Sequence, residues 1–349
     1  MELLLIFLST GVISYVSAFF LSRYPRILEQ GGLAIYAGVF LGTIAVSFMT
    51  PFPMSYYGIA PLLTAGSALA FFSVEKGKCP LWLLTIILCF TVSLFFMPEH
   101  LVFQGLLPFW ADRAVASLIW AGFVLMFYPF AEDTNFGLVQ AQTIFLAFLL
   151  LGFISQNVVF NNLMYYDVIL CGSVLGYLFM KQRLPWMEVG RVCGVFLGFI
   201  LGGFFFISAL TGGWTAFVIM PMFLYLDYLH AGIQEIKTRL TKKTYTSFYF
   251  LPKFVVLSAS GFSSFLMKRM MIVALLGALL QIIQTSVKTM VIMTVFSVVI
   301  ITIDTVIKIE NWGKPKVKFR DLFRDIHSAG KEVHSQFKKG MKELKNRSK

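Results

Sequence analysis

Residues 192–211 read VCGVFLGFILGGFFFISALT and contain no charged side chain. A helix of about 20 apolar residues is long enough to cross the ~30 Å hydrocarbon core of a bilayer. The whole chain has the same character, because 58% of its 349 residues are hydrophobic and only 13% are charged, whereas about a quarter are charged in soluble domains. The composition therefore excludes a large soluble domain and predicts an integral membrane protein.

Similar apolar runs recur along the chain and predict an all-α fold, a polytopic transmembrane helical bundle of about eleven spans. The expected spans are residues 2–22, 32–50, 56–74, 80–97, 114–131, 137–155, 164–180, 192–211, 213–229, 270–287 and 289–307. Gly198, Gly202 and Gly203 allow neighbouring helices to pack closely. The expected domains are a transmembrane helical domain over 1–308 and a cytoplasmic tail over 309–349.

The distribution of basic residues predicts the orientation. The chain carries 29 Lys and Arg against 17 Asp and Glu, a net charge of +12. If the loops after odd-numbered spans face the cytoplasm, every Lys and Arg except Arg113 and Lys288 lies on that side. The positive-inside rule then predicts an N-terminus outside and a C-terminus inside. We expect the protein in the inner (cytoplasmic) membrane. Glu2 replaces the basic start of a signal peptide, which favours an uncleaved first helix.

The tail over 309–349 has the pattern of a basic amphipathic helix. Phe319, Leu322, Phe323 and Ile326 recur close to helical spacing and are surrounded by Lys and Arg. Such a helix binds an anionic membrane surface, and a solvated basic tail is the alternative. No stacking platform or recognition fold accompanies the charge, so nucleic-acid binding is not predicted.

Cysteine and histidine spacing indicates neither a disulfide framework nor a metal site. The four cysteines form no C-x-x-C pair, and the four histidines form no H-E-x-x-H motif.

Five segments carry a family resemblance. They are Gly31-Gly32-Leu33-Ala34-Ile35, Ala70 to Pro80, Asp133 to Gln142, Gly190 to Phe199, and Pro221 to Asp227. In this order they resemble the motifs GGGLAI, GLLDDxxGxSP, DGxDGLAAGQ, GDxGSxFLGF and PxxD of the polyprenyl-phosphate N-acetylhexosamine-1-phosphate transferases, of glycosyltransferase family 4 type. The resemblance covers roughly residues 27–290.

The resemblance implies a cytoplasmic cleft in which Mg²⁺ bridges the pyrophosphate of a UDP-sugar while a polyprenyl phosphate enters from the membrane. The enzymes move a sugar-1-phosphate onto that lipid and release UMP during envelope glycan synthesis. Carboxylates collect around the metal because Mg²⁺ is a hard cation that takes several oxygen ligands.

The chain departs from this pattern at the acids. Ser73 and Val74 stand in place of the Asp-Asp pair, Phe136 and Arg191 replace two further Asp residues, and Lys181 replaces an Asn. The resemblance leaves Asp133 as the catalytic candidate. The candidates for substrate binding are Asp227, Lys181, Arg191, Glu188 and Lys76. Glu188 and Arg191 are also spaced to form a local ion pair.

Three functions fit these observations. The first is a degenerate, non-catalytic family member that binds polyprenyl phosphate, a glycosyltransferase partner or a second copy of itself, with an anionic headgroup held by basic residues and no metal. The second is an active transferase in which Asp133 and Asp227 hold Mg²⁺ together with Glu75 or Glu188. The third is a transporter, since Asp167 and Asp304 lie inside expected spans, although the sequence shows no inverted repeat. Whether the protein is an enzyme is left open.

Overall fold

The computed structural model describes residues 2–24, 31–49, 59–74, 80–103, 105–133, 135–154, 158–184, 187–211, 214–229, 262–283 and 287–310. These residues form helices and their connections, with no strand among them. The helices are α1 (Glu2–Leu21), α2 (Leu33–Met49), α3 (Ile59–Phe72), α4 (Leu81–Phe95), α5 (Phe109–Asp133), α6 (Asn135–Ile154), α7 (Val158–Arg183), α8 (Arg191–Leu210), α9 (Trp214–Ile219), α12 (Phe262–Ile283) and α13 (Val287–Glu310). The prediction of an all-α fold is confirmed for this part of the chain.

Within the described residues, five helical stretches are long and apolar enough to cross a membrane. They are Glu2–Leu21, Phe109–Pro129, Gly137–Ile154, Leu163–Arg183 and Arg191–Leu210. Shorter apolar helices cover Leu33–Ser47, Ile59–Phe72, Leu81–Phe95 and Val291–Asp304. These helices are compatible with a helical membrane protein. The number of spans and their orientation stay predictions.

The expected span 213–229 is divided into two short helical segments. Helix α9 ends at Ile219, and a second helical segment covers 222–229. Pro221 immediately precedes this second segment. Proline has no N–H to continue the hydrogen bonding of α9, but its carbonyl accepts the N–H groups of Leu224 and Tyr225 at the start of the next helix.

Residues 1–302 form one compact unit, and residues 303–349 form a second. In the second unit the structure describes only the end of α13, so the predicted amphipathic helix in the tail lies outside the described residues.

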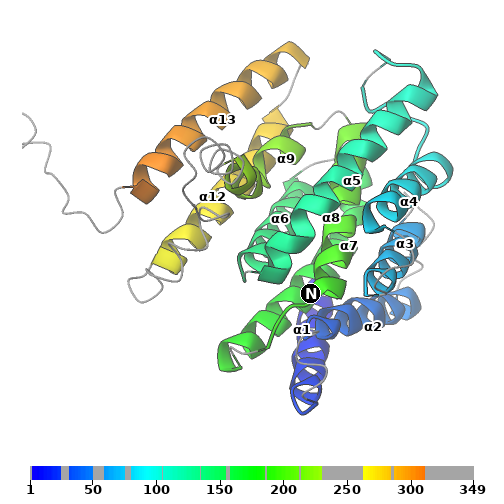
Figure 1. Cartoon of the computed structure of the whole chain (residues 1–349), viewed down its shortest axis with the longest axis vertical. Helices are drawn as coiled ribbons and strands as arrows, with labels where there is room; N and C mark the ends of the chain where they lie inside the picture. Colours follow the sequence, from blue (N-terminus) through cyan, green and yellow to red (C-terminus); the bar gives the residue numbers. More distant parts are fainter. Residues whose placement is uncertain are drawn as a thin grey trace, which may run out of the picture. The chain divides into compact units, whose positions relative to one another are not determined.

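Helix α8 lies between α5 and α3 in the first unit (Figure 1). Every residue from Val192 to Leu210 is buried. The indole N–H of Trp120 in α5 donates to the Phe199 carbonyl, with an N–O distance of 3.0 Å. A Cβ added to Gly202 would meet the Trp120 ring, and one added to Gly203 would meet Leu62 of α3. The predicted close packing at these glycines is therefore observed.

The contacts also give the direction of each helix. Helix α8 is antiparallel to α5, because Gly194 lies beside Tyr128 and Gly202 lies beside Trp120. It is antiparallel to α3 as well, and α2 is antiparallel to α7. Helices α1 and α7 are parallel, and Arg183 at the end of α7 donates to the Tyr15 hydroxyl of α1. The C-termini of α1, α3, α5 and α7 thus share one end with the N-termini of α2 and α8, called here the Gly190 end.

The opposite end, called here the Gly105 end, contains a buried pair of charged residues. The Asp112 carboxylate accepts the backbone N–H groups of Val102 and Phe103 at 3.0 and 2.7 Å. Arg113 donates to the carbonyls of Pro98 and His100. Both charged side chains are fully buried. Arg113, which the charge distribution placed at the outer surface, therefore holds the α4–α5 connection against the start of α5.

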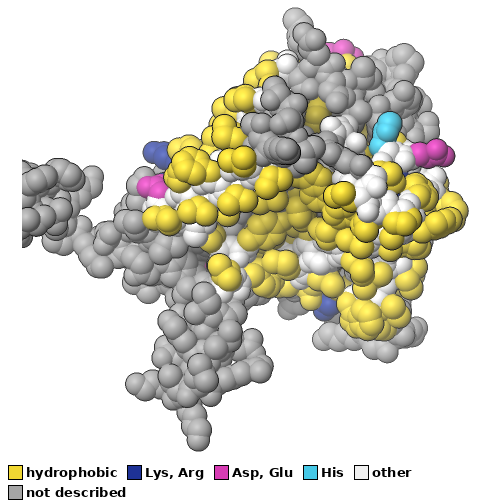
Figure 2. Space-filling view, turned by 90° about the horizontal axis from the view of Figure 1, so that it is seen from above, with side chains coloured by type: hydrophobic (Ala, Val, Ile, Leu, Met, Phe, Trp, Pro, Cys, Tyr) yellow, Lys and Arg dark blue, Asp and Glu magenta, His cyan; other side chains and the backbone are white. Residues whose placement is uncertain are grey.

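The described surface is strongly apolar. Figure 2 shows hydrophobic side chains over most of the visible face of the described residues. Exposed side chains include Leu4, Leu8 and Val12 of α1 and Ile292 and Phe296 of α13. An apolar surface of this extent suits contact with lipid acyl chains and would promote aggregation in water.

Backbone contact between α1 and α7 yields a test of the packing. A Cβ added to Gly176 would meet the backbone of Gly11, whereas nothing lies within 4 Å of a Cβ added to Gly122. Gly176→Ala must push α1 away from α7, so we expect it to lower the free energy of unfolding by about 1–3 kcal/mol. The measurement is the thermal unfolding midpoint in detergent. Gly122→Ala is the matched control and should leave the midpoint unchanged or raise it; equal losses in the two variants would contradict the α1–α7 contact.

Candidate functional site

Two of the five motif segments dock on each other at the Gly190 end. The backbone N–H of Gly32 donates to the Val189 carbonyl at 2.9 Å. A Cβ at Gly31 would meet Met187 and the Glu188 carbonyl, and a Cβ at Gly32 would meet Val189 and Cys193. Only residues without a side chain allow this approach. The Gly-Gly pair that opens α2 therefore fixes the connection 187–190 that leads into α8.

Side chains of α7 hold the same connection. The Tyr177 hydroxyl donates to the Glu188 carbonyl at 2.9 Å, and the Lys181 ammonium donates to the Met187 carbonyl. With the bond from Gly32, three consecutive carbonyls at 187–189 each receive a donor from another part of the chain. Lys181, a predicted substrate-binding residue, thus has a backbone partner and positions the connection.

Gly190 turns the chain from this connection into α8. Its φ of 77° and ψ of 156° lie in a region that residues with a side chain rarely adopt. Arg191 follows as the first residue of α8.

Arg191 is the most distinctive cation of the site. Its guanidinium carbon lies 5.2 Å from the centre of the Tyr128 ring. Its Nε atom is buried and has no hydrogen-bond acceptor among the described residues. One turn later, α8 touches the backbone of α5, since a Cβ at Gly194 would lie 2.9 Å from the Tyr128 carbonyl oxygen. The Nε atom is not accessible, but a guanidinium at the N-terminus of a long helix can bind an anion through its terminal nitrogens.

Ser73 is a residue that the family resemblance aligns with an acid of the transferases. It lies just after α3, where α3 reaches the Gly190 end, and its side chain is buried. The Ser73 hydroxyl donates to the Ala70 carbonyl at 2.6 Å. Val74, at the second acid position, is exposed. The residues that replace the Asp-Asp pair therefore present no carboxylate to the site.

Asp227 lies in the helical segment 222–229 and is 1% exposed. Its neighbour Tyr228 donates to the Met126 carbonyl of α5 at 2.8 Å, which brings this segment to α5 near its C-terminus. Glu188 is exposed. No ion pair joins Glu188 to Arg191 in the part of the chain that the structure describes.

Two predicted site residues cannot be placed in this geometry. Lys76 lies outside the described residues, and so does Glu75. Asp133 is the last residue of α5, but its side chain lies outside the described part, as does that of Phe136. The catalytic assignment of Asp133 stays a prediction.

The described side chains do not fit the Mg²⁺ site that the family resemblance implies. No group of three His, Cys, Asp or Glu residues with described side chains is arranged to hold a metal ion. Asp227 supplies a carboxylate, but the Ser73 hydroxyl is bound to its own helix. A cation at Arg191 would repel Mg²⁺, which takes several oxygen ligands.

Sequence reasoning missed Tyr177 and Tyr128. Tyr177 holds the connection before α8, and Tyr128 lies beneath the Arg191 guanidinium. Aromatic residues are common throughout this chain, and each of these two acts on a residue far from it in sequence. No local pattern could have distinguished them.

Comparison of the sequence with models of known protein families and with curated proteins finds no match. The family resemblance therefore depends on the five quoted segments alone.

Proposed function

We propose that this protein is a membrane-embedded, non-catalytic relative of the polyprenyl-phosphate sugar-1-phosphate transferases that binds the phosphate of a polyprenyl lipid at Arg191. The observation that carries the proposal is the Arg191 guanidinium, which lies beside Tyr128 with its Nε atom lacking a described acceptor. Guanidinium groups bind phosphate oxygens through charge-assisted and often bidentate hydrogen bonds.

The arrangement of the motif segments supports the proposal. Gly31-Gly32, Ser73 and the start of α8 all lie at the Gly190 end, as they would if they formed parts of one site. Asp227 is brought to α5 through Tyr228 at the same end. The segments are distant in sequence, so their meeting at one end is a consequence of the fold.

The absence of acids at several positions of the family pattern supports the loss of sugar-1-phosphate transfer activity. Displacement at a pyrophosphate builds negative charge, which the transferases neutralise with carboxylate-bound Mg²⁺. In this chain Ser73, Val74, Phe136 and Arg191 occupy acid positions of the family pattern. An acid at position 191 would bind Mg²⁺, whereas Arg191 binds the lipid phosphate directly. The lipid is therefore bound but is not activated for the reaction.

Arg191 gives the decisive binding test. Undecaprenyl phosphate should raise the thermal unfolding midpoint of the purified protein more than undecaprenol, which lacks the phosphate. Arg191→Gln should weaken binding about tenfold or more, because charge-assisted hydrogen bonds contribute about 1.5–3 kcal/mol. Arg23→Gln removes an exposed charge at the same end and is the matched control. Equal stabilisation by the two lipids would contradict phosphate recognition.

The same preparation tests whether the protein has lost transfer activity. Radiolabelled UDP-N-acetylhexosamine, undecaprenyl phosphate and Mg²⁺ should yield no lipid-linked sugar under conditions in which an active transferase does. Metal-dependent product would overturn the non-catalytic assignment and favour an active enzyme with rearranged ligands.

We place the proposed site on the cytoplasmic side of an inner membrane, because nearly all Lys and Arg residues lie in the loops expected on that side. Cysteine labelling tests this orientation in a Cys79→Ser background, since Cys89, Cys171 and Cys193 are buried. Leu106→Cys is at the Gly105 end, where Leu106 is 86% exposed, and should react with an impermeant maleimide in intact spheroplasts. Glu188→Cys should react only after lysis. The reverse pattern would place the site outside.

A proton-coupled carrier is a second candidate, and Asp167 favours it. This residue of α7 is 1% exposed, and neither carboxylate oxygen has a hydrogen-bond partner among the described residues. Buried acids in membrane helices often mark ion pathways. In proteoliposomes with an imposed potential, we expect the lumenal pH to match that of protein-free vesicles. Proton uptake by the wild type that Asp167→Asn abolishes would instead favour the carrier.

A further inference from the structure

Asp167 of α7 is a buried carboxyl group that the proposed phosphate site does not use. Only 1% of its surface is exposed, and neither carboxylate oxygen has a hydrogen-bond partner among the described residues. It precedes Arg183 by 16 residues, which is about 24 Å along the axis of α7. Asp167 is therefore distant from the Gly190 end, where Arg191 lies.

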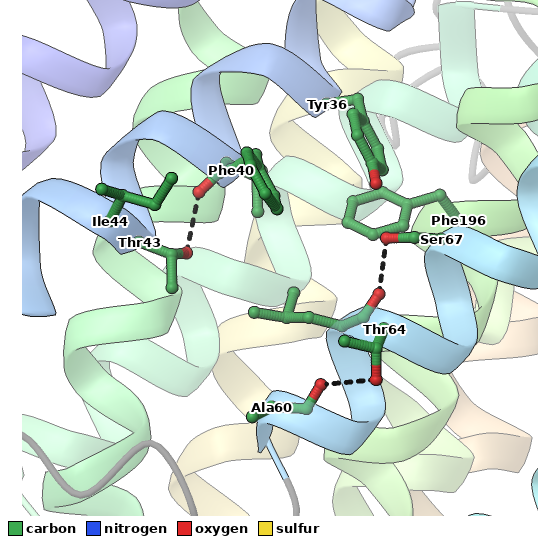
Figure 3. Close-up of a pocket in the computed structure, with 10 residues that line it drawn as sticks. Tyr36, Phe40, Thr43, Ile44, Ala60, Thr64, Ser67 and Phe196 are labelled. Atoms are coloured by element: carbon green, nitrogen blue, oxygen red, sulfur yellow. Dashed lines mark hydrogen bonds between the residues drawn. The ribbon is translucent and has the colours of Figure 1, made fainter.

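Hydroxyl side chains in the same bundle show how a polar group inside a helix can be satisfied. Thr43 and Ser67 line the pocket between α2 and α3, and each donates to a carbonyl of its own helix, at 2.7 and 2.6 Å (Figure 3). A carboxylate has acceptors only, so it cannot bond to helix carbonyls in this way. Because an unpaired buried charge is costly, Asp167 needs a donor or a positive charge from elsewhere.

A second unpaired oxygen lies on the neighbouring helix. Gln142 of α6 is 8% exposed, and its Nε2 atom donates to the Cys171 Sγ atom of α7 at 2.9 Å. The other amide atom, Oε1, is buried and has no donor among the described residues. Cys171 follows Asp167 by four residues, so the two side chains share one face of α7. The Gln142 amide thus meets α7 about one helical turn from the Asp167 carboxylate.

No described basic side chain pairs with Asp167. Helix α6 packs against α7 and contains no charged residue. Helices α1 and α2 pack on another face of α7, at Gly172 and Ser173 respectively. The basic residues of α7, Lys181 and Arg183, lie in its last turn and donate to other partners. The contact between α6 and α7 therefore contains three acceptor oxygens for which the described residues supply no donor.

We propose that Asp167 and Gln142 form a binding site for one Na⁺ ion between α6 and α7. Hard cations prefer oxygen ligands, and this contact offers two carboxylate oxygens and one amide oxygen. A single carboxylate carries one negative charge, which matches a monovalent ion. A divalent ion fits less well, since no three His, Cys, Asp or Glu residues with described side chains are grouped to hold a metal.

A proton would satisfy the same oxygens less completely than an ion does. A protonated Asp167 has one O–H donor, which can serve one acceptor and leaves the others unpaired. An ion between the helices contacts oxygens from both and neutralises the carboxylate. The site lies on different residues from the lipid phosphate site, so the inference goes beyond the proposed function and does not depend on it.

Binding of radioactive Na⁺ to the purified protein tests the site, in choline chloride at alkaline pH where few protons compete. The wild type should bind one Na⁺ per chain. Asp167→Asn should weaken binding at least about tenfold, because it removes the charged ligand. Gln142→Leu removes the amide oxygen and should also weaken binding, which keeps the test informative if the first variant does not fold. Ser173→Ala is the matched control, because Ser173 is buried on α7 but donates to its own helix, and it should bind Na⁺ as the wild type does.

Thermal unfolding distinguishes Na⁺ from a proton and from water. NaCl should raise the unfolding midpoint of the wild type above its value in choline chloride of equal ionic strength, and Asp167→Asn should abolish this difference. If NaCl has no effect while acidification stabilises the wild type but not Asp167→Asn, the site takes only a proton and the inference is overturned. If neither has an effect, water satisfies the oxygens and the inference is overturned too. Na⁺ binding that persists in both Asp167→Asn and Gln142→Leu would place the ion elsewhere.

Discussion

Close backbone approach around α8 is the constraint on which the described structure depends. Apolar burial gives little net attraction between helices that are already surrounded by lipid, so their association relies on tight van der Waals contact. Gly194, Gly198 and Gly202 lie against α5, and Gly203 lies against α3. Side chains at these positions would separate the helices. The same contacts bring the C-termini of α3 and α5 beside Gly190, so the packing of α8 also determines which residues meet at the candidate site.

Helix positions could be predicted well from sequence, because long apolar runs have few other folds available in a membrane. The expected span 192–211 corresponds to the observed helix α8, Arg191–Leu210. The expected span 137–155 corresponds to α6, Asn135–Ile154. The expected span 213–229 shows the limit of this reasoning. Its mean apolarity is that of a span, but Pro221 divides it, because hydrogen bonding of the backbone depends on single residues.

The site was less predictable, since each role depends on a partner far away in sequence. The distribution of basic residues placed Arg113 outside the membrane and Lys181 in a cytoplasmic loop, and it gave neither residue a partner. Arg113 is fully buried against carbonyls of the α4–α5 connection, and Lys181 donates to Met187. Of the basic residues proposed to bind an anion, Arg191 is therefore a better candidate than Lys181, and nothing in their local sequence indicates this difference.

The family resemblance places Arg191 where the transferases carry an acid, so the charge at the start of α8 has the opposite sign. The N-terminus of a helix carries partial positive charge. A carboxylate placed there would offset that charge and could still bind Mg²⁺, whereas a guanidinium adds to it and attracts phosphate directly. A guanidinium that binds the phosphate of the acceptor lipid does not replace the neutralisation that Mg²⁺ gives the pyrophosphate during the displacement. In the proposed function, this reversal of charge at the start of α8 would let the protein bind a lipid phosphate without Mg²⁺ and without transfer of a sugar-1-phosphate.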